Sequence, residues 1–309
     1  MRRLTQSAVA ILALVPLLAA GTGRLLGNGV VHPVRRPLAP ELIAEADRGF
    51  ERVGATRGDF DVRAPDGVLL RGWKVRPRSP NGDWVLLFHG VSDNRVGMLG
   101  YAEFLLRHGY SVLMMDARAH GASEGSMATY GWKERQDTRT IIEAFFSGET
   151  PHCLFALGES MGGAIALQSA AIGPRIEGVV AESSFSDLRE ASYDYAGLHL
   201  SSWLGKTLLR PLASAVVKAG EKEAGFKAEE VSPEKAVSAR AFPILLICGT
   251  RDHTLPCRHS KRIYAAARGP KQLWIVPGAA HASSLGAAPA EFERRVVAFY
   301  SAIHAVKQR

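Results

Sequence analysis

The chain has 309 residues, of which 47% are apolar and 22% charged, so it can bury a large core. One α/β domain with an insertion fits this length better than two domains. The formal net charge of +8 suggests an anionic partner, but residues 1–40 hold five arginines and no acidic residue. The remaining 33 basic and 30 acidic residues (38 minus 5 against 30) leave only +3, so we expect no nucleic-acid partner.

Residues 1–31 are predicted to form a signal peptide or a membrane anchor. Arg2 and Arg3 precede 13 uncharged residues, 8–20, which suit the apolar region of a signal peptide and fall short of the roughly 20 residues that span a bilayer. Small residues at 19–21 permit cleavage without forming a clear cleavage site. We expect an exported or membrane-anchored protein of the cell envelope, associated with the membrane through this segment. An uncleaved, tilted anchor stays open, as does a buried N-terminal helix of a cytoplasmic protein.

The body of the chain alternates between strand-like and helix-like segments. Residues 32–58 are polar and interrupted by prolines, and are predicted to be a connector to an α/β domain at 59–309. Eight strand-like segments follow, at 59–64, 68–75, 84–89, 111–116, 153–157, 178–182, 243–248 and 272–276. Helix-like segments fill most of the gaps, at 98–108, 133–147, 161–171, 258–267 and 290–306.

The strand pattern predicts the sheet. Pro65-Asp66-Gly67 is a hairpin signal between the first two strands, while the later strands are apolar throughout, as parallel strands covered on both faces are. We therefore expect an eight-stranded, mostly parallel sheet with helices on both faces. Ligands on such sheets bind at the carboxyl ends of the strands.

A helical insertion is predicted at about residues 184–232. This stretch has no strand signal, and its apolar residues between 198 and 217 recur at helical spacing. It could lie over the carboxyl edge of the sheet as a lid and form one wall of a substrate pocket. Simple packing of extra helices against the domain is an equal alternative.

Gly158-Glu159-Ser160-Met161-Gly162 spells G-x-S-x-G between a strand-like and a helix-like segment. In this context a nucleophilic serine sits on a sharp turn, and glycines two residues to either side let the two backbones pass closely. Ser160 is therefore the predicted nucleophile. The N–H of Met161, at the start of the helix, is a predicted oxyanion donor. The competing interpretation of Ser160 is an ordinary helix N-cap serine.

A serine nucleophile needs a general base that is oriented by a carboxylate. Asp252 follows the seventh predicted strand and His281 follows the eighth, so the order Ser, Asp, His suits a nucleophile after the fifth strand. We predict Asp252 as the orienting acid and His281 as the base. Glu182 and Asp187, near the end of the sixth strand, are the alternative acids.

The turn His89-Gly90-Val91 follows the third strand, and its glycine lets the backbone approach the nucleophile. The N–H of Val91 is the predicted second oxyanion donor. Several nearby polar residues are expected to have structural or solvated positions rather than chemical roles. These are His89, the loop 116–123, Glu134 and Asp137 as bracing groups, and His253, His259 and His304 as loop, helix-start or surface residues.

Three cysteines offer no disulfide framework and no metal-ligand spacing. Cys153 and Cys248 lie in apolar strands, where a buried thiol is the ordinary interpretation. Cys257 lies in a loop and is the one expected to be reachable.

Taken together, the chain resembles the serine-dependent α/β-hydrolase superfamily. The motifs that carry the resemblance are H-G-V at 89–91, D-A-R-A-H-G-A-S at 116–123, G-E-S-M-G at 158–162, G-T-R-D at 249–252 and P-G-A-A-H at 277–281. It looks most similar to bacterial hydrolases with an N-terminal hydrophobic segment that are grouped with serine esterases, lysophospholipases and aminopeptidase-like enzymes. The resemblance covers residues 59–305.

The resemblance implies a serine hydrolase that cleaves carboxylic esters through an acyl-enzyme intermediate, with no cofactor and no metal. The expected partner is a small-molecule acyl ester or amide. A peptidase, amidase or thioesterase on the same scaffold is the alternative. A non-catalytic binding module is a third hypothesis, although no member of the Ser160, Asp252 and His281 set is missing.

Overall fold

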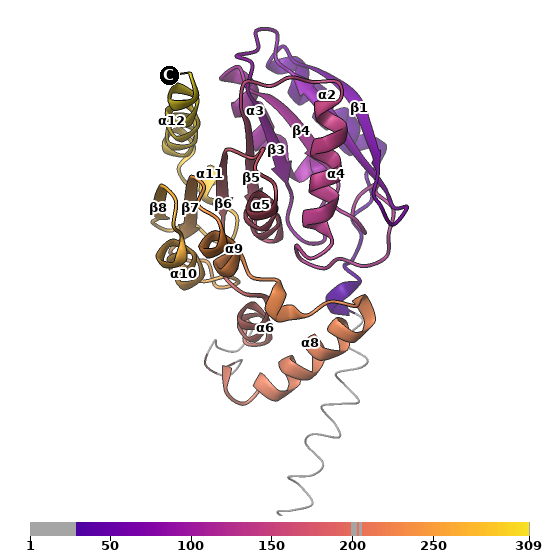
Figure 1. Ribbon diagram of the computed structural model, residues 1–309, viewed down its shortest axis with the longest axis vertical. Helices are drawn as coiled ribbons and strands as arrows, with labels where there is room; N and C mark the ends of the chain where they lie inside the picture. Colours follow the sequence, from indigo (N-terminus) through magenta and orange to yellow (C-terminus); the bar gives the residue numbers. More distant parts are fainter. Residues whose placement is uncertain (1–28, 199–202, 204–205, 309) are drawn as a thin grey trace, which may run out of the picture.

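The computed structural model describes residues 29–198, 203 and 206–308, and its centre is an open sheet of eight strands (Figure 1). Their spatial order is β1-β2-β4-β3-β5-β6-β7-β8. β1 and β4 both pair with β2 in antiparallel fashion, and the other neighbours are parallel. The strands are β1 (Thr56–Arg63), β2 (Leu69–Arg76), β3 (Trp84–Phe88), β4 (Ser111–Met115), β5 (Leu154–Glu159), β6 (Gly178–Glu182), β7 (Ile244–Gly249) and β8 (Lys271–Val276). The predicted sheet is confirmed.

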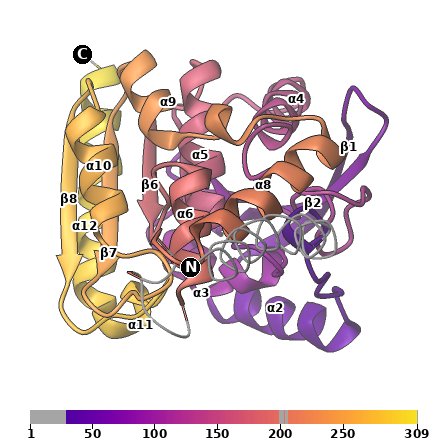
Figure 2. The same ribbon diagram turned by 90° about the horizontal axis from the view of Figure 1, so that it is seen from below.

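Helices cover both faces of the sheet, as the apolar strands require. α2, α3 and α12 pack on one face, and α4, α5, α9 and α10 pack on the other (Figures 1 and 2). Their bounds are α2 (Pro40–Arg52), α3 (Leu99–Arg107), α4 (Glu134–Phe146), α5 (Met161–Ile172), α9 (Pro233–Ala239), α10 (Arg258–Ala266) and α12 (Pro289–Lys307), with a short α11 (Ser284–Ala287) between β8 and α12.

The predicted connector at 32–58 contains α2, a helix that the sequence pattern did not predict. Proline is favourable at the first helical position, which Pro40 occupies, and the apolar residues Ala46 and Phe50 lie on one side of the helix. Phe50 is buried and its ring meets Trp73 of β2 edge-on, with 6.3 Å between the ring centroids. Charged residues between these positions concealed the apolar stripe. The packed domain therefore begins before residue 59.

The residues just before α2 lie against the domain as well. Val31 is fully buried, and the ring of His32 contacts the carbonyl of Ser126 at 2.6 Å and Glu223 at 2.7 Å. The predicted signal or anchor segment at residues 8–20 lies outside the described residues. Among the helices that the structure does describe, none is long and apolar enough to cross a membrane.

The predicted insertion is helical where the structure describes it. It contains α6 (Leu188–Ala196), α8 (Arg210–Ala224) and a 3₁₀ turn, η2 (Ala228–Glu230), and the two helices lie at the lower end of the molecule in Figure 1. Val217 of α8 is buried, whereas Trp203 and Leu208 are exposed. That the insertion acts as a lid, rather than as additional packed helices, stays a prediction.

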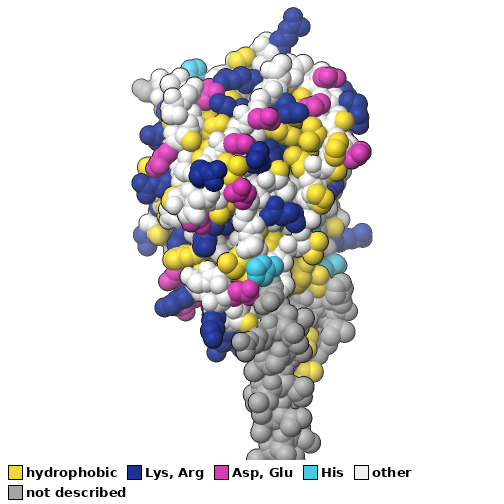
Figure 3. Space-filling model, turned by 90° about the vertical axis from the view of Figure 1, so that its right-hand side faces the viewer, with side chains coloured by type: hydrophobic (Ala, Val, Ile, Leu, Met, Phe, Trp, Pro, Cys, Tyr) yellow, Lys and Arg dark blue, Asp and Glu magenta, His cyan; other side chains and the backbone are white. Residues whose placement is uncertain are grey.

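Charges of both signs are mixed on the surface. On the face shown in Figure 3, basic and acidic side chains alternate without a continuous patch of one sign. Ion pairs account for part of this mixing, for example between Arg71 and Asp61, and between Lys74 and Glu149.

The turn between β5 and α5 brings three backbone segments into close contact. Ser160 has φ 53° and ψ −119°, a conformation that residues with a side chain rarely adopt. A Cβ added at Gly162 would overlap the carbonyl oxygen of Phe88 and lie 2.6 Å from that of His89. At Gly158 an added Cβ would overlap the carbonyl group of Gly162. The two glycines therefore permit the strand, the helix and the end of β3 to meet.

We expect Phe50→Ala to lower the free energy of unfolding by about 3–5 kcal/mol, because it removes a buried aromatic ring from the contact between α2 and the sheet. Urea denaturation measures this. Val34→Ala is the matched control: Val34 is 81% exposed, and its truncation should change stability by no more than about 0.5 kcal/mol. Equal effects of the two substitutions would show that α2 does not belong to the folded domain.

We expect Gly162→Ala to destabilise the protein by more than about 4 kcal/mol or to prevent folding, because the new Cβ meets backbone atoms that cannot rotate away. Gly148→Ala is the control, since an added Cβ there meets no atom within 4 Å. Circular dichroism during urea titration compares the two variants. A Gly162→Ala protein as stable as the wild type would contradict the close contact.

Candidate active site

The structure brings Ser160, His281 and Asp252 together at the carboxyl ends of β5, β8 and β7. Ser160 Oγ lies 2.9 Å from His281 Nε2, and His281 Nδ1 lies 2.9 Å from Asp252 Oδ2. The Asp252 side chain is fully buried, whereas that of His281 is 25% exposed. Because an ionised carboxylate can only accept, Nδ1–H donates to Asp252 and Nε2 is left to accept from the Ser160 hydroxyl. This is the relation that proton transfer from a serine requires.

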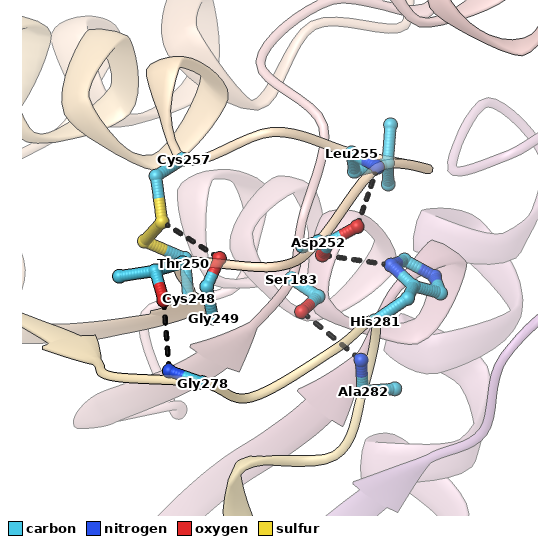
Figure 4. The surroundings of a disulfide bond; sticks show 10 residues. All are labelled: Ser183, Cys248, Gly249, Thr250, Asp252, Leu255, Cys257, Gly278, His281 and Ala282. Carbon is cyan, nitrogen blue, oxygen red and sulfur yellow. Dashed lines mark hydrogen bonds and ion pairs between the residues drawn. A yellow bond between two sulfur atoms is a disulfide. The ribbon is translucent and has the colours of Figure 1, made fainter. Parts of the chain in front are cut away.

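Asp252 is held by the loop that carries it (Figure 4). The N–H of Leu255 donates to Asp252 Oδ1 at 2.8 Å, and the N–H of Asp252 itself donates to the carbonyl of Gly249. A disulfide between Cys248 and Cys257 closes the two ends of this loop. Both oxygens of Asp252 therefore have a donor, and the loop has a covalent tie.

The disulfide corrects the prediction that Cys248 is a buried thiol and Cys257 a reachable one. The loop returns so that the Cα atoms of Cys248 and Cys257 lie 5.5 Å apart, within the range that a disulfide spans. Cys248 and Cys257 are nine residues apart in the sequence, and this spacing alone does not predict that the loop brings them together. Cys153 is free and buried, as predicted.

The loop that carries His281 is held by hydrogen bonds on both sides of the histidine. The N–H of Gly278 donates to Thr250 Oγ1 at 2.8 Å, and the N–H of Ala282 donates to Ser183 Oγ at 3.2 Å (Figure 4). Further along, the N–H of Ser284 donates to Glu182 Oε1 at 2.7 Å. The end of β6 thus contacts the His281 loop at two points, a feature that the sequence pattern did not reveal.

Glu182 and Asp187, the alternative candidates for the orienting acid, bind groups other than His281. Glu182 is fully buried and binds the N–H of Ser284 and the hydroxyl of Tyr101. Asp187 caps α6 by accepting from the N–H of Arg189 at 3.0 Å. Of the three candidates, Asp252 is the one hydrogen-bonded to His281.

Two backbone segments beside Ser160 carry the predicted oxyanion donors, Val91 and Met161. The N–H of Ser160 donates to the carbonyl of Glu182 at 2.9 Å, but within the described chain no acceptor is paired with the N–H of Val91 or of Met161. A Cβ built on Gly90 would lie 3.7 Å from Cβ of Ser160, so the turn after β3 passes directly beside the serine. Two donors without internal partners next to a nucleophile suit the stabilisation of a developing negative charge.

His89 has the bracing position that the sequence predicts. Its Nε2 accepts from the N–H of Ala117 at 3.0 Å, which leaves Nδ1–H to donate to the carbonyl of Gly90 at 2.8 Å. Asp116 braces the neighbouring loop: one oxygen accepts from the N–H of Arg95, and the other accepts from the guanidinium of Arg95 at 2.8 Å. Both ring nitrogens of His89 and both oxygens of Asp116 are thus committed to holding the turn.

Glu134 and Asp137 are also structural, as predicted. Glu134 accepts from the N–H and the hydroxyl of Thr129, both at 2.7 Å. Asp137 pairs with the buried guanidinium of Arg118. Burial raises the pKa of Asp137 to about 6, against the opposing effect of Arg118.

His259 lies at the start of α10, as predicted, but it is fully buried rather than solvated. Its Nδ1 lies 2.9 Å from the hydroxyl of Ser186, and its Nε2 lies 2.8 Å from Asp194 of α6. Burial, followed by the charge of Arg258, lowers the pKa of His259 to about 4. The partner on α6 is 65 residues distant in the chain, so no local pattern could identify it.

His304 lies partly buried on α12, with its Nδ1 2.8 Å from Asp83. Together with Cys153 these residues form a group with the donor atoms of a metal site, and it is the one such group in the described part of the chain. Asp83 also accepts from the N–H of Cys153, and burial raises the pKa of the Cys153 thiol to about 12. Hydrogen bonds thus explain the cluster.

Comparison with known proteins supports the architecture. The family model described as "Serine aminopeptidase, S33" matches residues 79–231. YqkD of Bacillus subtilis, described as an uncharacterised protein, is 30% identical over 241 residues, which cover 76% of this chain and 75% of that one.

Solved structures show the same fold. The esterase Pf2001 of Pyrococcus furiosus superimposes with a TM-score of 0.70 at 24% identity, over 88% of this chain and 97% of that chain. The acylaminoacyl peptidase of Pyrococcus horikoshii gives a TM-score of 0.60 at 18% identity, over 78% of this chain and 40% of that chain. The sheet order, the strained turn at Ser160 and these relationships lead to one conclusion: the chain belongs to the α/β-hydrolase superfamily and is a hydrolase.

Proposed function

We propose that this hydrolase is a serine esterase that cleaves carboxylic esters through an acyl-enzyme intermediate. The observation that carries the proposal is the continuous hydrogen-bonded series from Ser160 through His281 to Asp252, with 2.9 Å at each step. Its three residues come from the ends of three different strands, so their convergence has no simple explanation as local structure. Loss of one member would be expected of a non-catalytic binding module, and all three are in place.

In the first half of the reaction, Ser160 Oγ attacks the acyl carbonyl and its proton passes to His281 Nε2. The carbonyl oxygen takes up the negative charge and is stabilised by the N–H groups of Val91 and Met161. The carbon–oxygen bond to the leaving alcohol then breaks, and the alcohol takes the proton from His281. Asp252 keeps the imidazole oriented and stabilises its protonated form.

In the second half, water replaces the alcohol. His281 removes a proton from the water as it attacks the acyl carbon. The bond to Ser160 Oγ then breaks, Oγ regains its proton from His281, and a carboxylic acid is released. The cycle needs no metal or organic cofactor, because proton transfer and oxyanion stabilisation both come from the protein.

An amide or peptide substrate is the second candidate. It is favoured by the serine aminopeptidase description of the matching family and by the likeness to an acylaminoacyl peptidase. Thioesters pass through the same acyl-enzyme intermediate. Ester cleavage ranks first because the esterase gives the higher TM-score of the two solved structures, with a match over 97% of its chain.

We expect Ser160→Ala to lower kcat for short acyl esters by at least about 10³-fold, because among the described residues no other hydroxyl is hydrogen-bonded to the His281 ring. The same substitution should abolish labelling by a fluorophosphonate. Ser147→Ala, which changes an exposed serine at the end of α4, is the control and should leave both readouts intact. Undiminished turnover by the Ser160→Ala protein would refute the mechanism.

The purified enzyme, assayed on acyl esters of increasing chain length, thioesters and aminoacyl amides, should give its highest kcat/KM on an ester. A higher value on an amide would assign the protein to the second candidate while leaving the Ser160 mechanism in place. Failure of the wild-type protein to react with the fluorophosphonate would instead favour the binding module.

We further propose that the protein is exported to the cell envelope and associates with the membrane through the apolar segment at residues 8–20, which precedes Val31, a residue buried in the domain. The apolar segment at 8–20 supports export, and the Cys248–Cys257 disulfide supports it independently, because such bonds persist mainly in oxidising compartments.

Alkylation of the denatured protein from separated cell fractions tests this location. We expect the protein in the envelope fraction, with Cys153 as its single alkylated cysteine, because the other two are paired. Mass spectrometry of the same sample reports whether the N-terminus is cleaved. Protein in the cytoplasmic fraction with three alkylated cysteines would contradict export.

A further inference from the structure

Two carboxyl groups and one phenol meet directly behind Ser160. β5 and β6 are parallel neighbours whose register pairs Glu159 with Glu182, so two acidic side chains lie side by side at the ends of adjacent strands. Tyr101 of α3 reaches both: its hydroxyl lies 2.7 Å from Glu182 Oε2 and 3.1 Å from Glu159 Oε2. Tyr101 and Glu182 are buried.

The Tyr101 hydroxyl contacts two carboxyl groups, and its one proton does not suffice for two hydrogen bonds. A phenol has a single hydroxyl proton, so Tyr101 cannot donate to both carboxylates at once. One of the two carboxyls must bring its own proton and donate to the phenol oxygen. Otherwise two negative charges, one fully buried and one half-buried, would face each other with one donor between them, which is costly in a low dielectric.

The contacts decide which carboxyl holds the additional proton. Both oxygens of Glu182 already have donors, since Oε1 accepts from the N–H of Ser284 at 2.7 Å and Oε2 faces the hydroxyl of Tyr101. Glu159 has one hydrogen-bonding contact within the described residues, the longer one to the phenol oxygen. The ionised form of Glu182 is thus the better satisfied, which leaves the proton on Glu159.

We propose that Glu159, Tyr101 and Glu182 form a proton-sharing chain that positions the His281 loop against Ser160, with Glu159 holding the additional proton. The hydrogen bonds run from the Glu159 carboxyl to the Tyr101 oxygen, and from the Tyr101 hydroxyl to the Glu182 carboxylate. The assignment of His281 as the group being positioned rests on the proposed function.

The chain connects the two sides of the site. Glu159 immediately precedes Ser160, and Glu182 binds the backbone of Ser284, three residues after His281. Ser183, the residue after Glu182, binds the N–H of Ala282. The end of β6 therefore holds His281 from its C-terminal side while Tyr101 links that strand end to the nucleophile turn. Glu159, Tyr101 and Glu182 are positioning residues, since they act through Ser160 and His281.

The charges around Glu159 are consistent with a carboxyl that titrates near neutrality. Burial, then the charge of Glu182, raises the pKa of Glu159 to about 7; Asp93 raises it further, while the contact with the Tyr101 hydroxyl and the charge of His281 oppose the rise. Asp93 is itself paired with Arg36 at 2.7 Å. Burial also raises the pKa of Tyr101 well above its ordinary value, so its hydroxyl keeps its proton.

The raised pKa sets the sign of the pH dependence. Between the ordinary pKa of a glutamate and about 7, folded Glu159 binds a proton that the unfolded chain releases. The contribution of this group to stability therefore falls as pH rises through that window. Glu159→Gln supplies a permanent N–H donor to Tyr101, so the variant should lose this dependence.

The proton is tested by infrared difference spectroscopy and thermal unfolding of the full chain from about pH 5 to about pH 9. We expect a protonated carboxyl band that titrates near pH 7, is absent in Glu159→Gln and is retained in the exposed control Glu143→Gln. The Tm of Glu159→Gln minus that of wild type should rise with pH up to about pH 7, the upper end of the window in which folded Glu159 binds its proton. A band unchanged in Glu159→Gln, or a pH-independent Tm difference, overturns the assignment of the proton.

The direction of the chain is tested by Glu182→Gln. Its amide N–H should donate to the oxygen of Tyr101 and turn the phenol proton toward Glu159, so the carboxyl band of Glu159 should titrate at a lower pH than in wild type. An unchanged band position in Glu182→Gln overturns the chain.

Positioning is tested by kinetics. Glu182→Ala should lower kcat by about 10²-fold with little change in KM, because the His281 loop loses its acceptor while the substrate pocket is kept. Glu182→Gln, which keeps an acceptor for Ser284, should recover most of the loss. Equal kcat values for Glu182→Ala and wild type overturn the positioning role. Should Glu182→Ala fail to fold, a tenfold or greater fall in kcat for Tyr101→Phe supports the role, and an unchanged kcat overturns it.

These measurements separate two failures. If the wild-type protein neither cleaves esters nor reacts with a fluorophosphonate at Ser160, the proposed function fails, while the infrared titration still tests the proton because it requires no substrate. If Ser160 reacts and the titration of Glu159 is absent, the proton-sharing chain alone fails.

Discussion

The site depends on the close approach of the first turn of α5 to the end of β3. Gly162 lies so near the carbonyl oxygens of Phe88 and His89 that no side chain fits between them. This contact forces the chain to turn sharply between β5 and α5, and the turn holds Ser160 at φ 53°. It also places the start of α5 beside the loop after β3, so Met161 and the Gly90-Val91 turn both lie close to Ser160. The positions of the candidate catalytic groups therefore depend on this backbone packing.

The sequence predicted the features that depend on neighbouring residues. Apolar runs marked the strands of the sheet, and because parallel strands end at one edge, the residues after β5, β7 and β8 could be expected to meet there. Ser160, His281 and Asp252 do meet, each within hydrogen-bond distance of the next. The local signals sufficed because each residue follows its strand within a few positions.

Features that depend on distant partners were not predictable in the same way. In α2, charges between Ala46 and Phe50 concealed an apolar face whose partner, Trp73, lies on another element. The partners of His259 are equally distant, since Asp194 belongs to α6. Two glutamates at neighbouring strand ends could have been noticed once the strand order was known. The phenol between them comes from α3, which no spacing rule brings there.

The two sides of the site are held by different kinds of bond. Around β3 and β4 the loops are braced by buried polar groups, such as Asp116 with Arg95 and the two ring nitrogens of His89. Around β7 the loop of Asp252 has a disulfide instead. In the loops around β3 and β4, removal of one partner leaves a buried charge without its counter-ion. Those residues should therefore tolerate substitution poorly.

α10 joins the acid loop to the helical insertion. Cys257, the residue before α10, is covalently bound to the end of β7, and His259 in its first turn is hydrogen-bonded to Asp194 of α6. A helix fixed at one end by such bonds moves as a rigid unit rather than bending. Any displacement of α6 would therefore be transmitted through α10 to the end of β7, which carries Asp252. The position of the Asp252 carboxylate would then depend on the position of the helical insertion.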